Sequence, residues 1–139
     1  MDISDDEVAI AELLKTTKRV AVLGMKMEPH QPAFYVPKYL ADAGIEIVPV
    51  PVYYPDVSEI LGRRVYRKVA DVPGPIDIVD VFRRSQDVAQ HLDDLLAAKP
   101  RCVWLQQGIR DDKTAAALSK AGILVVQDRC LMVDHERLA

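Results

Sequence analysis

The sequence of 139 residues has little of several features that mark particular protein classes. It carries only two cysteines, Cys102 and Cys130, and neither lies in a CxxC pair. We therefore expect reduced thiols in a cytoplasmic protein rather than a disulfide scaffold. The three histidines are scattered, so the sequence shows no zinc-ligand spacing and predicts no metal. No apolar run is long enough to span a bilayer, and the acidic start MDISDDEVAI lacks the basic flank of a signal peptide.

The net charge is also small. The formal net charge is −3, so bulk electrostatics give no reason to expect binding to nucleic acid or to a membrane. Half of the residues are apolar and 28% are charged, as in ordinary globular proteins. We predict one domain over residues 1–139, with a helix in residues 1–17 packing on it. Any anion site must then come from a local cluster of donors.

Short apolar runs alternate with amphipathic segments along the chain. The predicted strands are Arg19–Leu23, Ile45–Val50, a short edge strand at Val65–Tyr66, Ile76–Phe82, Cys102–Leu105 and Ile123–Val126. The first predicted helix runs from a Ser4–Glu7 capping box to Lys15, and the second from Pro32 or Ala33 to Gly44. A single helical turn is predicted at Val57–Leu61, followed by a helix that Ser85 caps and that carries Val88, Leu92, Leu95 and Leu96 on one face. The last two predicted helices are Lys113–Lys120 and Leu131–Arg137. Pro37 either distorts the second helix or marks a later start.

This alternation predicts an α/β fold. Strands that are nearly continuous apolar runs belong to a parallel sheet covered on both faces. Right-handed crossovers then favour a three-layer, Rossmann-like, doubly wound and mainly parallel sheet, with strand order 3-2-1-4-5. Ligands of such folds lie beyond the carboxyl ends of the strands, where the strand order reverses. The segments placed there are 24–32, 82–85, 106–110 and 128–130.

The loop after the first strand is a candidate anion site. Gly24 permits positive φ or a close ligand, and the loop leads into a helix N-terminus. Lys26, His30 and Gln31 supply donors, although a solvated turn would look similar. The loop reads GMKMEP, with one glycine where a dinucleotide fingerprint needs three, and no acidic residue ends the second strand. NAD is therefore disfavoured, and a P-loop is excluded because no GK[ST] follows a glycine turn.

Three further strand ends face the same region. Phe82, Arg83 and Arg84 offer an aromatic ring and two guanidiniums, which suit an adenine and phosphates; alternatively, Phe82 is core and the arginines are a solvated strand end. Gln107 and Gly108 border the site or make a structural turn. Cys130 follows the sixth strand; a catalytic cysteine needs an adjacent base, and His135 is too far along the helix to be assumed its partner.

Six blocks occur together and in order. They read RVAVLGMKMEPHQPAFYVPKYL, IVPV, ILGRRVY, IDIVDVFRR, VWLQQGIR and VVQDRCLMVDHERL. Through them the chain, from about Lys18 to its last residue, resembles the small bacterial and archaeal CoA-binding proteins. These are single-domain relatives of the CoA-binding domain of the succinyl-CoA synthetase α subunit. No single block is specific, but the combination of VDVFRR, WLQ-x-GIR and DRCL is.

The resemblance implies coenzyme A, or an acyl-CoA, along the carboxyl edge of the sheet. The pyrophosphate would meet the Gly24-Met25-Lys26 turn and the helix start at Gln31-Pro32, and the adenosine end would approach Val50 and the Phe82-Arg83 corner. Relatives usually have Arg-Pro where this chain has Gln31-Pro32, and PVNP where it reads PVPV from Pro49. Each lost charge-assisted contact is worth about 1.5–3 kcal/mol, so we expect modest affinity.

The expected function is that of a non-catalytic CoA-binding protein with an enzyme partner or a homo-oligomeric state. The ligase activity of larger relatives requires a phosphohistidine and a nucleotide-grasp partner carried on other domains. Two alternatives stay open. One is a thiol or acyl-transfer enzyme that uses Cys130 with CoA. The other is a degenerate Rossmann domain that acts through protein contacts, as the departures at Gln31 and Pro51 would allow.

Overall fold

The computed structural model describes residues 1–139 and contains a five-stranded parallel sheet of order β2-β1-β5-β6-β7. Its strands are β1 (Arg19–Leu23), β2 (Glu46–Val50), β5 (Ile78–Val81), β6 (Cys102–Leu105) and β7 (Leu124–Val126). Val22 lies between Pro49 on one side and Asp80 on the other. β1 and β5 are therefore neighbours in the sheet, although 54 residues lie between Leu23 and Ile78 in the chain. The order of the strands reverses at this point: β2 lies on one side of β1, and β5, β6 and β7 lie on the other. This is the predicted doubly wound, Rossmann-like α/β fold.

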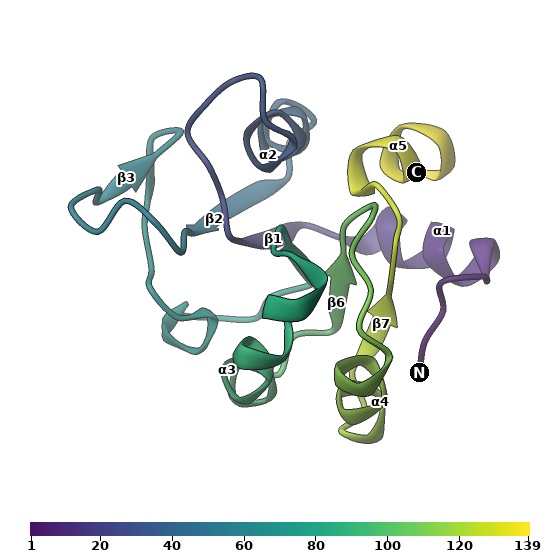
Figure 1. Ribbon diagram of the computed structural model, residues 1–139. Coiled ribbons are helices and arrows are strands. Elements are labelled where there is room, and N and C mark those ends of the chain that lie inside the picture. Colours follow the sequence, from purple (N-terminus) through teal and green to yellow (C-terminus); the bar gives the residue numbers. More distant parts are fainter.

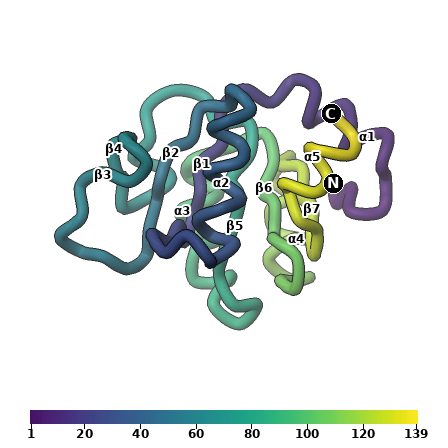
Figure 2. Tube along the Cα trace, turned by 90° about the horizontal axis from the view of Figure 1, so that it is seen from above, coloured from purple at the N-terminus to yellow at the C-terminus, as the bar shows by residue number.

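Helices cover both faces of the sheet (Figures 1 and 2). They are α1 (Glu7–Thr16), α2 (Pro32–Asp42), α3 (Leu92–Ala98), α4 (Asp112–Lys120) and α5 (Leu131–Leu138). One core cluster joins α1, α2 and α5 to one face, and includes the fully buried Leu40 and Trp104. A second joins α3 and α4 to the other face, and includes Leu95 and Leu118. The N-terminal helix thus packs on the domain through the first cluster.

Both edges of the sheet carry additional backbone contacts. Asp2 forms a parallel bridge with Val125 of β7, where the Ile3 amide donates to the Val125 carbonyl at 2.8 Å. At the other edge the Tyr66 amide donates to the carbonyl of Pro49 in β2 at 3.0 Å. Residues outside the five strands therefore cover part of each edge.

The region after β2 differs from the sequence-based expectation. The predicted helical turn at Val57–Leu61 is wrong: β3 (Glu59–Ile60) and β4 (Arg63–Arg64) form an antiparallel hairpin there. Leu61 and Gly62 both have positive φ, 52° and 71°, as a two-residue hairpin turn requires. Val65–Tyr66 is not a strand, so the predicted third strand is missing from the observed order.

Two predicted caps are also wrong. Asp6, not Ser4, caps α1 by accepting a hydrogen bond from the Ala9 amide at 3.1 Å. Ser85 begins a 3-10 turn, and its hydroxyl accepts from the Arg110 amide at 3.0 Å instead of capping a helix. α2 does begin at Pro32, and it continues through Pro37. None of the helices is both long and apolar enough to cross a lipid bilayer.

Candidate functional site

The turn after β1 tolerates only glycine. Gly24 has φ +85°, and a Cβ at this position would lie 2.3 Å from the carbonyl oxygen of Phe82. The Gly24 amide donates to the Val50 carbonyl at 2.9 Å, and the Phe82 amide donates to Leu23 at the same distance. The ends of β1, β2 and β5 are therefore drawn together at one point, where the polypeptide leaves the sheet.

The loop then enters α2 in a way that suits an anion. Gln31 is the N-cap, and its side chain makes no capping hydrogen bond, so the side-chain amide can meet a ligand. Pro32 occupies the first helical turn, which contains no acidic residue. A helix N-terminus carries a partial positive charge from its unpaired amides. This end of α2 faces the cavity described below.

Two cations flank one aromatic ring beside this loop. Lys26 Nζ lies 4.1 Å from the centroid of the Tyr53 ring, and the guanidinium carbon of Arg83 lies 5.9 Å from it. Arg83 is held in place, because its side chain is only 10% exposed and its Nε donates to Nε2 of His91 at 3.2 Å. Arg84 is 75% exposed and pairs with Asp87 at 2.8 Å. Of the two neighbouring arginines, Arg83 is thus the one whose side chain is fixed at the cavity.

Long-range contacts hold the loop that carries Tyr53. Arg67 donates to the carbonyls of Tyr53, Tyr54 and Val57, at 3.0, 2.6 and 2.9 Å. The Tyr54 hydroxyl donates to the Glu28 carboxylate at 2.7 Å, and this bond lowers the pKa of Glu28. The Tyr53 loop is therefore tied both to Arg67, in the segment after the β3–β4 hairpin, and to the loop before α2.

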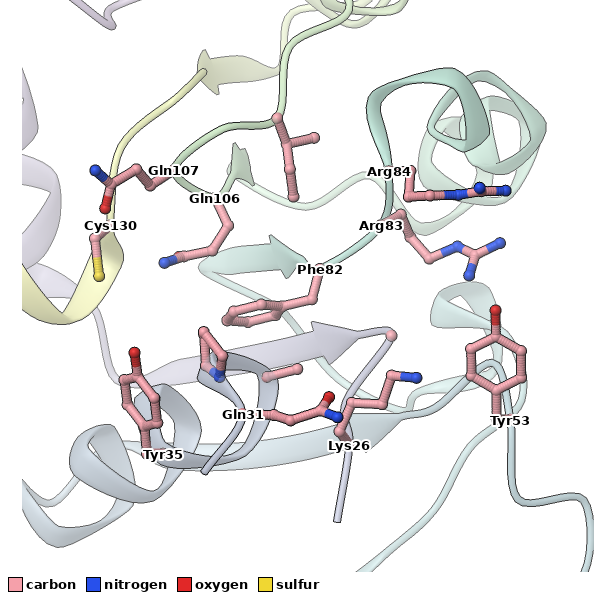
Figure 3. A pocket seen from close by; sticks show the side chains of 14 residues that line it. Lys26, Gln31, Tyr35, Tyr53, Phe82, Arg83, Arg84, Gln106, Gln107 and Cys130 are labelled. Atoms are coloured by element: carbon pink, nitrogen blue, oxygen red, sulfur yellow. The ribbon is translucent and has the colours of Figure 1, made fainter. Parts of the chain in front are cut away.

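The Gly24 turn, the start of α2 and the side chains of Lys26, Tyr53 and Arg83 line one cavity of about 630 Å³ at the carboxyl edge of the sheet. Figure 3 shows Lys26, Tyr53, Arg83 and Arg84 at one end and Cys130, Gln107 and Tyr35 at the other, with Phe82 between them. The lining residues are Gly24, Lys26, Gln31, Pro32, Ala33, Tyr35, Tyr53, Phe82, Arg83, Arg84, Gln106, Gln107, Ile109 and Cys130. The cavity is therefore cationic at one end and neutral at the other.

Residues 18–136 match the family model described as "CoA binding domain". The chain belongs to this family. It is 36% identical to the uncharacterized protein YneT of Bacillus subtilis over 126 residues, which is 91% of each chain. The solved structure of cell-free ID.343 from Thermus thermophilus superposes with a TM-score of 0.89 at 41% identity, covering 96% of this chain and 99% of that one. The family indicated by the sequence motifs is confirmed.

The fold of this CoA-binding domain also occurs within a larger protein. A dinucleotide-forming acetyl-coenzyme A synthetase from Ca. Korarchaeum cryptofilum superposes with a TM-score of 0.67 over 83% of this chain, at 20% identity. The likeness shows a shared fold. The matched part is 27% of the synthetase chain.

Seven of the residues predicted for the site line the cavity. They are Gly24, Lys26, Gln31, Pro32, Phe82, Arg83 and Gln107. Four others lie elsewhere. Met25 and Val50 are buried in the two core clusters, and His30 is exposed outside the cavity. The Gly108 amide donates to Asp128 at 2.7 Å, so this glycine shapes the turn after β6.

The structure adds three lining residues from outside the segments that the sequence placed at the site, namely Ala33, Tyr35 and Tyr53. Arg84, Gln106 and Ile109 also line the cavity, and they lie within the predicted segments 82–85 and 106–110. The Gln106 side-chain oxygen accepts from the Leu131 amide at 3.2 Å, which joins the end of β6 to α5 beside Cys130. Gln106 was visible as a polar residue directly after a buried strand, whereas Tyr53 lies in a loop without periodicity.

A buried carboxyl lies in β5 two residues before Phe82. Asp80 is fully buried, and neither of its carboxyl oxygens has a hydrogen-bond partner. Burial raises the pKa of Asp80 well above its ordinary value. An uncharged acid is the form that such an apolar position tolerates. Asp80 therefore belongs to the core under the site and adds no charge to the cavity.

Proposed function

We propose that this protein binds coenzyme A, or an acyl-CoA, in the cavity at the carboxyl edge of the sheet, and that it does so without catalysis. The cluster of Lys26, Arg83 and Tyr53 is the observation that carries the proposal, together with membership of the CoA-binding family. CoA pairs an anionic nucleotide with a long, neutral pantetheine arm. The cavity pairs a cationic end with a neutral end lined by amide side chains.

Each part of the ligand has a matching set of groups. The pyrophosphate would lie over the Gly24 turn and the N-terminus of α2, within reach of Lys26. The adenosine end would approach Phe82, Arg83 and the exposed ring of Tyr53. The pantetheine amides would then extend toward Gln106 and its neighbours. A volume of about 630 Å³ lies in the usual range for small-molecule sites.

The lining also supports a non-catalytic role. It contains no histidine, aspartate or glutamate, which are the side chains that most often transfer protons in catalysis. Arg83 binds anions, and a guanidinium does not supply a general base because it stays protonated in proteins. We propose that any acyl transfer uses an enzyme on another chain, as the fold shared with a part of acetyl-coenzyme A synthetase suggests.

Isothermal titration calorimetry of the purified protein with CoA, acetyl-CoA and NAD tests the proposal. We expect saturable binding of CoA or acetyl-CoA at one site per chain and none of NAD. Native mass spectrometry of freshly purified protein would show a CoA-sized adduct and the number of associated chains. Absence of heat with millimolar CoA, in a sample shown to be folded, rejects the proposal and leaves a domain that acts through protein contacts.

A second candidate rests on the position of Cys130, which lines the neutral end of the cavity and is partly exposed. Its thiolate would attack CoA disulfide, forming a protein–CoA disulfide and releasing one CoA thiolate. Incubation with CoA disulfide followed by intact-mass analysis tests this. A CoA adduct on the protein that is missing in Cys130→Ser supports the exchange. The same adduct in Cys130→Ser, or none in the unmodified chain, removes it.

A further inference from the structure

Pro37 leaves a gap in the hydrogen bonding of α2. The helix runs from Pro32 to Asp42 with Pro37 inside it. Proline has no amide hydrogen, so the Ala33 carbonyl, four residues earlier, loses the donor that it would have in a regular helix. Ala33 and Pro37 are both buried. A buried carbonyl without a donor is costly, so this oxygen needs a partner from outside the helix.

The partner comes from the loop after β1. The Lys26 amide donates to the Ala33 carbonyl oxygen at 3.2 Å. The proline ring also pushes against the carbonyl four residues before it, which tilts that oxygen away from the helix axis. The hydrogen bond therefore joins the anion-binding loop to α2 at the carbonyl that Pro37 makes available.

We propose that Pro37 is a positioning residue for Lys26. This inference rests on the proposed function. Pro37 is absent from the cavity lining, whereas Lys26 lines it and its ammonium lies 4.1 Å from the Tyr53 ring. The backbone bond fixes where the lysine side chain begins, and that side chain then spans the distance to the ring. Preorganisation of this kind reduces the ordering cost of binding an anion.

The Pro37→Ala variant is the direct test. Alanine restores an amide that competes with Lys26 for the Ala33 carbonyl, and it is a better helix former than proline. We expect the variant to be at least as stable as the unmodified protein. We expect hydrogen exchange at the Lys26 amide, followed by NMR without ligand, to become about tenfold faster. The dissociation constant for CoA should rise about 3- to 10-fold, the effect of one hydrogen bond.

Matched variants separate positioning from a general effect on stability. Pro73→Ala, at an exposed position outside α2 and outside the cavity lining, should change neither the Lys26 exchange rate nor CoA affinity. Pro37→Gly also restores the amide, with poorer helix propensity, and should reproduce the binding defect if Pro37→Ala does not fold. In a Lys26→Ala background, Pro37→Ala should weaken CoA binding little further, because both changes act through the same side chain.

The outcomes are distinguishable from failure of the proposed function. An unchanged Lys26 exchange rate in Pro37→Ala overturns the inference whether or not CoA binds. Faster exchange with unchanged CoA affinity overturns the positioning role and leaves only the hydrogen bond. If the unmodified protein binds no CoA, the proposed function fails, and with it the positioning role. Faster exchange together with weaker CoA binding supports the inference.

Discussion

Arg83 donates a hydrogen bond from its Nε to Nε2 of His91 at 3.2 Å. The acceptor nitrogen must be unprotonated, so this contact selects neutral His91 with its proton on Nδ1. Burial, and then the charge of Arg83, lower the pKa of His91. Asp87 and Asp94 act in the opposite direction, but to a smaller extent. The fixed position of Arg83 at the cavity therefore depends on a histidine that stays neutral.

This pair predicts an acid-dependent loss of stability. Because the pKa of His91 is lower in the folded than in the unfolded protein, the unfolded state binds more protons as the pH falls below about 6.5. The stabilisation is present above that pH and is lost as the pH falls through the folded-state pKa. His91→Gln keeps an acceptor near the Nε2 position without titrating. Urea unfolding between pH 8 and 5 should give a flatter profile for this variant, and identical profiles would contradict the prediction.

The buried carboxyl of Asp80 predicts that the unfolding free energy falls as the pH rises, the opposite of the effect of His91. Its pKa is raised in the folded state, so its contribution is fully present below about pH 4 and is lost as the pH rises toward the folded-state pKa. One such group changes the unfolding free energy by about 1.4 kcal/mol per pH unit across that window. Asp80→Asn and Asp80→Val should remove this slope, as measured by urea unfolding from pH 4 to 8. A slope that persists in both variants would show that Asp80 is not its source.

Gly24→Ala should destabilise the fold more than a matched glycine substitution. A Cβ at Gly24 combines a left-handed backbone with a clash against Phe82, and we expect a loss of about 2–5 kcal/mol. Gly44 has a similar φ of +92°, but a Cβ there would meet nothing within 4 Å. Gly44→Ala should therefore cost only the backbone strain of about 1–2 kcal/mol. Equal losses in denaturant unfolding would rule out the close approach.

Arg83 and Arg84 should differ in their effect on ligand binding. Arg83 is almost fully enclosed, is held by His91 and lies 4.0 Å from the Asp87 carboxylate, whereas Arg84 is mostly exposed and pairs with the same carboxylate at 2.8 Å. We expect Arg83→Gln to weaken CoA binding by about 10-fold or more in a calorimetric titration. Arg84→Gln should change the affinity about threefold or less, because exposed charges contribute little. A larger loss of CoA affinity in Arg84→Gln than in Arg83→Gln would contradict this prediction and make Arg84 the main ligand-binding arginine.

The sequence was sufficient to predict the framework of the molecule. Apolar runs such as Arg19–Leu23 lie at the strand positions expected of them, and Pro32 marks the start of α2 because proline suits the first helical turn. The strand ends then bring Gly24, Phe82 and Gln107 to one cavity, because carboxyl ends of parallel strands share an edge. These features follow from local patterns combined with topology.

Features set by long-range contacts escaped prediction. Gly62 is as compatible with a helix stop as with a hairpin turn, and only pairing of Glu59 with Arg64 decides between them. Tyr53 reaches the cavity because Arg67 holds its loop through three carbonyls. The sequence also places Asp80 in a strand without showing that its carboxyl lacks a partner. Each of these depends on groups that are distant along the chain.

The partly covered edges of the sheet bear on whether its strands can pair with those of another chain. In β2 the Pro49 carbonyl points outward to Tyr66, and the missing amide of this proline would point the same way. At the opposite edge, residues 1–3 already occupy the backbone groups of Val125. Exposed strand edges are the usual templates for intermolecular β-pairing and aggregation. The backbone contacts of residues 1–3 and of Tyr66 therefore oppose the addition of a further strand at Val125 and at Pro49.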